Sequence, residues 1–193
     1  MVAVLWVNIN YKKEINFMKK QIRNSVFETN SSSTHSICIS KKPVLATWKH
    51  VDFYIGDYGW EHDSVDPASY LYTAILCMSD SENLIKQLKD VLNQNKITYS
   101  FAKPDYSEEG WLNNGYVDHS YDARDFIDTV LSNEDMLIRY LFGDSYVYTG
   151  NDNGGSYFDM CYAAYETIWD DNYKQIPNPN HDSKNYDYFF KGN

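Results

Sequence analysis

One polar stretch that runs straight into an apolar segment carries more information than any other part of the chain. It reads Phe27-Glu28-Thr29-Asn30-Ser31-Ser32-Ser33-Thr34-His35-Ser36 and continues as Ile37-Cys38-Ile39. Nine of the first ten residues carry a hydroxyl, amide, carboxylate or imidazole group. Beyond them, Ile37 and Ile39 share one face of an extended segment, and Ser36, Cys38 and Ser40 share the other. The pattern predicts a strand over 34–40 that begins in a loop rich in hydrogen-bonding groups.

This polar loop has three interpretations. In the first it binds an anion or nucleotide, because serine and threonine hydroxyls can donate to phosphate oxygens. The residues of that candidate set are Glu28, Asn30, Ser31, Ser32, Ser33 and Thr34. In the second it is catalytic, with His35 as a general acid or base at neutral pH. The loop lacks the glycines of a phosphate-binding loop and the nucleophile elbow of a hydrolase. The third interpretation, a hydrogen-bonded structural turn, is therefore equally good.

Two later segments supply further candidates. Asp118-His119 places a carboxylate beside an imidazole, which suits proton transfer or a divalent metal. Asn151-Asp152-Asn153 clusters side-chain oxygens, but Tyr162 stands where a calcium loop of this type needs a glutamate. An ordinary polar turn also explains each of these segments. A shared site requires residues 28–35, 116–119 and 150–153 to meet in space. We predict no cofactor for a binding protein. We expect a divalent metal only if the protein is an enzyme.

Periodicity predicts an alternation of helices and strands. Asp66 followed by Pro67 is typical of a helix start, and 81–94 carries one apolar stripe. The expected helices cover 67–78, 81–94, 121–131 and a segment from Ser132. The expected strands cover 20–28, 34–40, 51–55, 97–101 and 145–149. Residues 150–155 are expected to turn, a helix is expected from about 159, and the last twenty residues are expected to be irregular.

This order of elements predicts an α+β fold with a small, mostly antiparallel sheet packed by three to four helices. The length of 193 residues favours a single domain, which we place at 18–170. Residues 1–17 are a candidate N-terminal extension, because Met18 opens a segment that resembles a natural start. Residues 171–193 are expected to form a C-terminal loop or tail.

The charge is unevenly placed along the sequence. Of 17 basic and 27 acidic residues, eight basic and two acidic residues lie in 1–50, which gives +6. The remaining nine basic and 25 acidic residues give −16. Such a surface repels duplex nucleic acid and anionic membranes and suits a basic protein partner. The 18 tyrosines predict a large half-buried or interfacial aromatic surface.

The cysteines indicate a reducing compartment. Cys38, Cys77 and Cys161 lie far apart, and none has the spacing of a zinc site. The sequence shows no signal peptide or membrane-spanning segment, so we expect reduced thiols in a bacterial cytosol. Cys38 and Cys77 both lie in apolar runs and are expected in the core.

The segment Lys20-Gln21-Ile22-Arg23-Asn24-Ser25-Val26-Phe27 and the polar stretch through Ser36 resemble the opening of a group of proteins encoded by phages and low-GC Gram-positive bacteria. Three later pieces resemble the same group more loosely, namely 115–119, 140–142 and 145–153. The resemblance spans roughly residues 20–155 and implies a genetic setting without implying a mechanism.

Two functional hypotheses follow. In the first, an acidic, tyrosine-rich surface binds and inhibits a basic host protein that handles nucleic acid or acts in defence, as anti-CRISPR and anti-restriction inhibitors do. In the second, the chain is a small enzyme acting on a nucleotide or phosphoester, with His35, Asp118 and His119 as catalytic residues and Asn151 and Asp152 among the ligand-binding residues. The first is favoured because the second needs three separate segments to converge.

Overall fold

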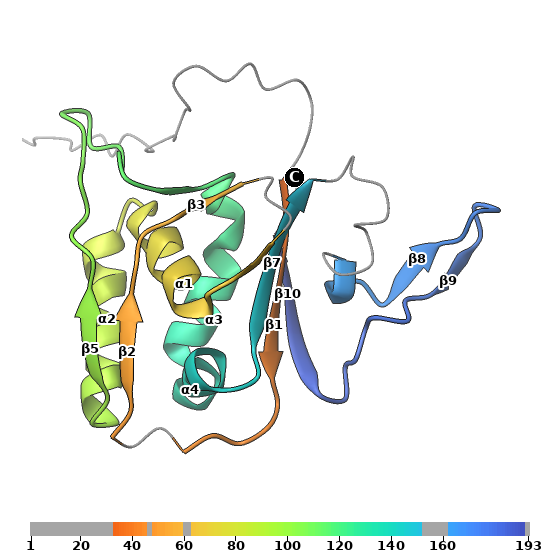
Figure 1. The fold of residues 1–193 in the computed structure, drawn as a ribbon, viewed down its shortest axis with the longest axis horizontal. Helices are drawn as coiled ribbons and strands as arrows, with labels where there is room; N and C mark the ends of the chain where they lie inside the picture. Colours follow the sequence, from red (N-terminus) through yellow and green to blue (C-terminus); the bar gives the residue numbers. More distant parts are fainter. Residues whose placement is uncertain (1–32, 46–47, 60–62, 152–161, 192–193) are drawn as a thin grey trace, which may run out of the picture.

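The fold is built on a four-stranded antiparallel sheet. It is seen in a computed structural model that describes residues 33–45, 48–59, 63–151 and 162–191. The strand order is β10 (Tyr186–Lys191), β1 (Ser33–Ser40), β7 (Tyr146–Asn151) and β4 (Asp63–Val65). Figure 1 shows helices α1, α3 and α4 on one side of this sheet and a short 3-10 helix, η3 (Tyr162–Ala164), on the other.

Strand β1 is the centre of the sheet and is buried along all eight residues. It pairs with β10 on one side and with β7 on the other. Ile37 and Ile39 belong to the hydrophobic core that the helices cover. The predicted strand and its two-faced pattern are therefore confirmed, and Cys38 is buried as expected.

Helix α1 (Pro67–Leu76) is the buried centre of the helical layer. Residues 68–76 are all buried, as expected for a helix that is apolar on every side. The Asp66 carboxylate accepts a hydrogen bond from the Ser69 amide at 2.8 Å and caps the first turn. The helix start predicted from Asp66 and Pro67 is confirmed.

A second, smaller layer covers the far side of α1. It contains α2 (Ser81–Gln94) and the parallel pair β2 (His50–Phe53) and β5 (Thr98–Phe101). The two-residue strands β3 (Asp57–Tyr58) and β6 (Tyr116–Val117) form another parallel pair. The main sheet is antiparallel as predicted, whereas these two accessory pairs are parallel.

Helices α3 (Arg124–Ser132) and α4 (Glu134–Phe142) complete a set of four α-helices in the described residues. A 3-10 turn, η1 (Ser120–Ala123), leads into α3. Helix α4 begins at Glu134, two residues later than expected, because the Asn133 side chain caps it by accepting from the Met136 amide at 3.1 Å. The result is the predicted α+β fold.

Arg139 of α4 fastens the helical layer to the sheet. Its guanidinium donates to the Ser40 carbonyl at 2.6 Å and to the Asp187 carboxylate at 3.3 Å. A third bond, at 2.8 Å, reaches Asp135 within the same helix. The side chain is almost fully buried, so these bonds join α4, β1 and β10 away from solvent.

The C-terminal third departs most from the sequence-based prediction. Residues 186–191 form strand β10 rather than a loop or tail, with Ser36 opposite Phe190. Residues 167–169 and 175–177 are strands β8 (Thr167–Trp169) and β9 (Gln175–Pro177), which pair as a hairpin, and not a continuation of a helix. Residues 150 and 151 belong to β7 rather than to a turn. Asparagine, aspartate and proline dominate the composition here and hide the two-residue alternation of β10.

Several predictions fall outside the described residues. They are the extension 1–17, the choice between Met1 and Met18, the strand 20–28 and the start of the helix at 159.

Candidate functional site

The described parts of the three candidate segments meet at one end of the main sheet. Strand β1 begins beside the end of β7, where Ser33 pairs with Asn151. The β3–β6 pair lies at the same end, because the His35 ring reaches the Gly59 carbonyl at 3.1 Å. The Asp118 amide donates to the Tyr58 carbonyl at 2.8 Å. These bonds place the His35 ring within roughly 12 Å of the Asp118 backbone, given the spacing of consecutive residues.

His35 is a buried junction of this region. Its Nε2 lies 3.1 Å from the Gly59 carbonyl, and its Nδ1 lies 2.8 Å from the Tyr70 hydroxyl. A carbonyl only accepts, so Nε2 carries the proton, and in the neutral ring Nδ1 accepts from Tyr70. The side chain is 0% exposed. A group enclosed in this way joins β1 to α1 and to the loop at Gly59, and it offers no nitrogen to a substrate in solvent.

The Tyr70 hydroxyl is protonated and can therefore donate to the His35 ring. Complete burial raises the pKa of its hydroxyl well above the ordinary value. The hydroxyl therefore keeps its proton at neutral pH and can donate to His35. The two rings meet edge-on with their centroids 5.6 Å apart.

The predicted ligand-binding set is divided by the structure. Ser33 and Thr34 are buried within β1 and do not line a solvent-open loop. Asn151 ends β7. Glu28, Asn30, Ser31, Ser32 and Asp152 lie outside the described residues. The anion-binding hypothesis therefore keeps no solvent-open hydroxyl within the part of the loop that the structure describes.

Asp118 and His119 lie at a sharp bend that leads into η1. His119 has a left-handed backbone conformation with φ of 47°. Its Nε2 lies 4.0 Å from the Asp118 carboxylate, which is beyond hydrogen-bonding distance. The imidazole is the more exposed of the two side chains, at 36% against 14%. Within 33–45, 48–59, 63–151 and 162–191, no three His, Cys, Asp or Glu side chains come together to hold a metal ion.

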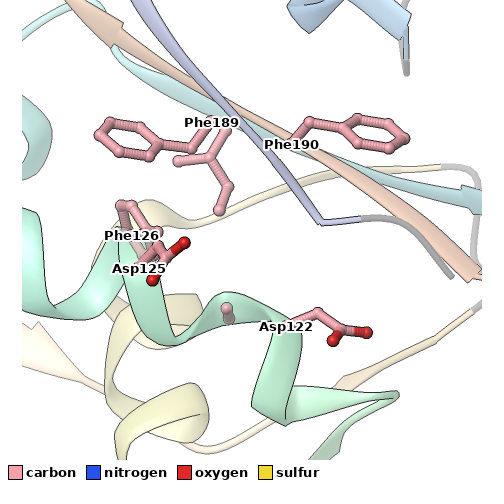
Figure 2. A pocket seen from close by; sticks show the side chains of 7 residues that line it. Asp122, Asp125, Phe126, Phe189 and Phe190 are labelled. Carbon is pink, nitrogen blue, oxygen red and sulfur yellow. The ribbon is translucent and has the colours of Figure 1, made fainter.

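A small hollow lies next to this bend, along the side of β10 (Figure 2). Its volume is about 60 Å³, far below the roughly 300–1,000 Å³ of small-molecule sites. In Figure 2, Asp122 and Asp125 lie on the helical side of the hollow, and Phe189 and Phe190 lie on the side of β10. The hollow is lined by Ile37, Asp122, Ala123, Asp125, Phe126, Phe189 and Phe190. The hollow is too small for a nucleotide.

The two aspartates belong to a run of carboxylates at one-turn spacing along η1 and α3. Asp122, Asp125 and Asp128 make up the run, and Asp118 precedes it on the other side of the left-handed residue His119. Asp128 is neutralised by Arg124 at 2.8 Å. In the part of the chain that the structure describes, Asp122 and Asp125 form no ion pair. The sequence shows the spacing of these aspartates. The structure adds that Arg124 pairs with Asp128, which leaves Asp122 and Asp125 as the carboxylates that could attract a cation from outside.

Most tyrosines of the sheet are packed against one another. On the face of the sheet away from the helices, the rings of Tyr146 and Tyr148 lie 5.1 Å apart. The rings of Tyr146 and Tyr186 lie 5.3 Å apart. His181 stacks on Tyr188 at 4.5 Å. These side chains are half-buried, so this face of the sheet carries the half-buried aromatic surface that the composition predicts.

Several aromatic side chains are largely exposed, and they lie in different parts of the protein. Trp169 is 69% exposed on β8, and Tyr173 is 88% exposed in the turn between β8 and β9. Tyr121, beside Asp122 in η1, is 76% exposed. Trp111 is tied down instead, since its indole nitrogen donates to the Glu109 carboxylate at 3.1 Å.

Comparison with protein-family models, curated proteins and solved structures finds no match. The resemblance to phage and low-GC Gram-positive proteins accordingly stays a prediction. No helix among the described residues is long and apolar enough to cross a membrane.

Proposed function

We propose that the protein is a phage or mobile-element accessory protein that binds and inhibits a basic host protein, one that handles nucleic acid or acts in defence. The observation that carries this proposal is the hollow with its two unneutralised carboxylates and phenylalanine rings. Carboxylates attract a lysine or arginine head, and aromatic faces stabilise it further. A basic groove that binds nucleic acid presents such heads in number.

The buried candidate residues favour binding over chemistry. His35 is closed off from solvent, and Asp118 and His119 are too far apart to share a proton directly. The hollow beside them has no room for a nucleotide. Binding through charge and ring faces needs none of these groups to be reactive.

The distribution of acidic residues over the surface limits where the proposed partner would bind. Exposed acidic residues occur on α2, α4 and the loop near Glu108 as well as on α3, so the surface as a whole does not form one acidic stripe. The run on η1 and α3 is the exception. We therefore place the contact at this run and not on the whole acidic surface.

Partner capture from extract of the native host cell tests the proposal. The tagged full chain is expected to retain one basic nucleic-acid-handling protein. The double variant Asp122→Asn/Asp125→Asn is expected to retain at least tenfold less, because two attractive charges are lost. The matched control Glu108→Gln/Glu134→Gln removes the same charge elsewhere and should retain the wild-type amount.

The retained protein should also lose its nucleic acid when wild-type protein is added, as measured by fluorescence anisotropy of a labelled oligonucleotide. Retention of no basic protein would contradict the proposal, as would equal losses in both double variants.

The enzyme hypothesis keeps one supporting observation, the meeting of the three segments at one end of the sheet. It predicts release of phosphate or base from a nucleotide or phosphodiester panel, with and without Mg²⁺ or Mn²⁺. Activity that is abolished by His119→Gln and kept by His50→Gln would favour it over the binding proposal.

A further inference from the structure

The β8–β9 hairpin projects from the body of the protein as a separate two-stranded sheet (Figure 1). Its strands are exposed at both outer positions and half-buried at the middle one. Ile168 faces Ile176 across the hairpin, and Trp169 faces Gln175. A two-stranded hairpin of this kind gains little stability from its own burial. Its shape therefore has to be held by specific bonds.

The turn at the tip is held by one aspartate. The Asp170 carboxylate accepts from the amides of Asn172 and Lys174, each at 2.9 Å. The Asp170 carbonyl accepts from the Tyr173 amide at 2.9 Å. Tyr173 has a left-handed backbone with φ of 57°, which is uncommon for a bulky side chain. These bonds hold the backbone of the turn, and the Tyr173 side chain is 88% exposed there.

The base of the hairpin is fastened to the rest of the protein. The Asn178 amide donates to the Glu166 carbonyl at 2.9 Å, and its side chain donates to the Tyr165 carbonyl at 2.9 Å. The Tyr165 ring packs 4.4 Å from that of Phe190 in β10. The Asp182 amide donates to the Tyr188 hydroxyl at 2.7 Å. A rigid base and a rigid tip mean that little conformational entropy is lost when the tip is bound.

The chemistry of the tip indicates its partner. Trp169 and Tyr173 are among the most exposed large side chains of the described residues, and tryptophan and tyrosine dominate the energetic centres of interfaces. Between Glu166 and Pro177 the hairpin has three acidic residues and one basic residue. Asp171 and Glu166 flank the rings and are exposed. The complementary surface is an apolar groove bordered by lysine or arginine.

We infer that the β8–β9 hairpin is a docking element whose Trp169 and Tyr173 rings enter an apolar groove of a basic protein partner. The inference rests on the proposed binding function and assigns the element that makes the central contact. The acidic run on η1 and α3 contributes charge, and the hairpin contributes the anchoring rings.

Site-specific photocrosslinking tests the inference. The photoreactive residue p-benzoylphenylalanine replaces Tyr173 in one sample of full-length protein and the 62%-exposed Tyr54 in a control sample. Each is irradiated in extract of the native host cell, and crosslinked proteins are identified by mass spectrometry. The protein found from position 173 is then purified and titrated by calorimetry against the wild type and the variants.

Three variants separate anchoring from folding. Trp169→Ala and Tyr173→Asn remove the rings, and asparagine tolerates the left-handed backbone at 173. Trp48→Ala removes an equally exposed ring, 81% exposed, outside the hairpin. We expect Kd to rise about 30-fold or more for each hairpin variant, as for an interface anchor, and to stay within threefold for Trp48→Ala.

Results other than the expected ones would overturn the docking role of the hairpin. A basic partner that binds Trp169→Ala and Tyr173→Asn as tightly as wild type overturns the docking role and leaves the proposed function standing. Crosslinking from 173 only to second copies of the chain, or to an acidic protein, also overturns it. If position 173 crosslinks no basic protein while the tagged wild type still retains one, the docking role alone is overturned; if the wild type retains no basic protein either, the proposed function falls with it.

Discussion

At the residue scale, His35 shows how a side chain that looks catalytic in the sequence can serve the fold. The imidazole replaces the hydration of two buried polar groups with its own two nitrogens, one bonded to Tyr70 and one to Gly59. A buried donor or acceptor that loses its partner is costly. Sequence alone cannot reveal this role, because the partners lie 35 and 24 residues away.

His35→Leu is therefore expected to lower the free energy of unfolding by about 2–4 kcal/mol, since it removes both hydrogen bonds while keeping an apolar side chain. Urea denaturation followed by circular dichroism measures the change. The control His50→Leu alters a half-exposed histidine, at 52% of its side-chain surface, and should shift stability by less than about 1 kcal/mol. Equal midpoints for the two variants would show that the His35 junction contributes nothing.

At the scale of elements, the sequence predicted those helices whose ends and buried faces are set by neighbouring residues. Helix α1 could be located from Asp66 and Pro67, and α2 from its apolar stripe, because caps and periodicity act within a few residues. Strand β10 could not be located, because it is defined by pairing with β1 some 150 residues earlier in the chain. The hollow could not be predicted either, since β1, η1, α3 and β10 each supply part of its lining.

A substitution of Arg139 tests how strongly this side chain joins α4 to the sheet. Arg139→Met removes the bonds to Ser40 and Asp187, so that among the described residues the Asp187 carboxylate keeps Lys41 as its cationic partner, at 3.2 Å. We expect a loss of about 1–3 kcal/mol in unfolding free energy, because the buried Ser40 carbonyl loses the donor that Arg139 supplies. Lys86→Met, which breaks an exposed pair with Asp90 on α2, is the control and should cost less than about 0.5 kcal/mol.

At the scale of the whole molecule, the tyrosines connect stability to pH. Burial raises the pKa of Tyr58 to about 12 and raises the pKa of Tyr70 and of Tyr140 well above the ordinary value. The folded state therefore holds these protons more tightly than the unfolded state, in which tyrosine has a pKa of about 10. Stability is fully present below that value and is lost as pH rises above it.

We accordingly expect that these tyrosines do not change the midpoint of urea denaturation between pH 7 and 9. Above pH 10 they should make the midpoint fall steadily. Each fully buried ring contributes a loss of about 1.4 kcal/mol per pH unit. Tyr140→Phe should reduce the slope between pH 10 and 11, because it removes one of these groups. Its hydroxyl also donates to the Pro67 carbonyl at 2.7 Å, so the variant starts from a lower midpoint at pH 7. An identical slope in the variant would contradict the assignment.

The position of β1 between β7 and β10 has a consequence for folding kinetics. Its residues pair with partners more than 100 residues away on one side and about 150 residues away on the other. Closing such long loops precedes any gain from the pairing, so the sheet belongs to the slow-folding, high-contact-order class. During synthesis, the side of β1 that receives β10 stays open until residue 191 has left the ribosome. The helical layer, whose contacts are local, can form well before that point.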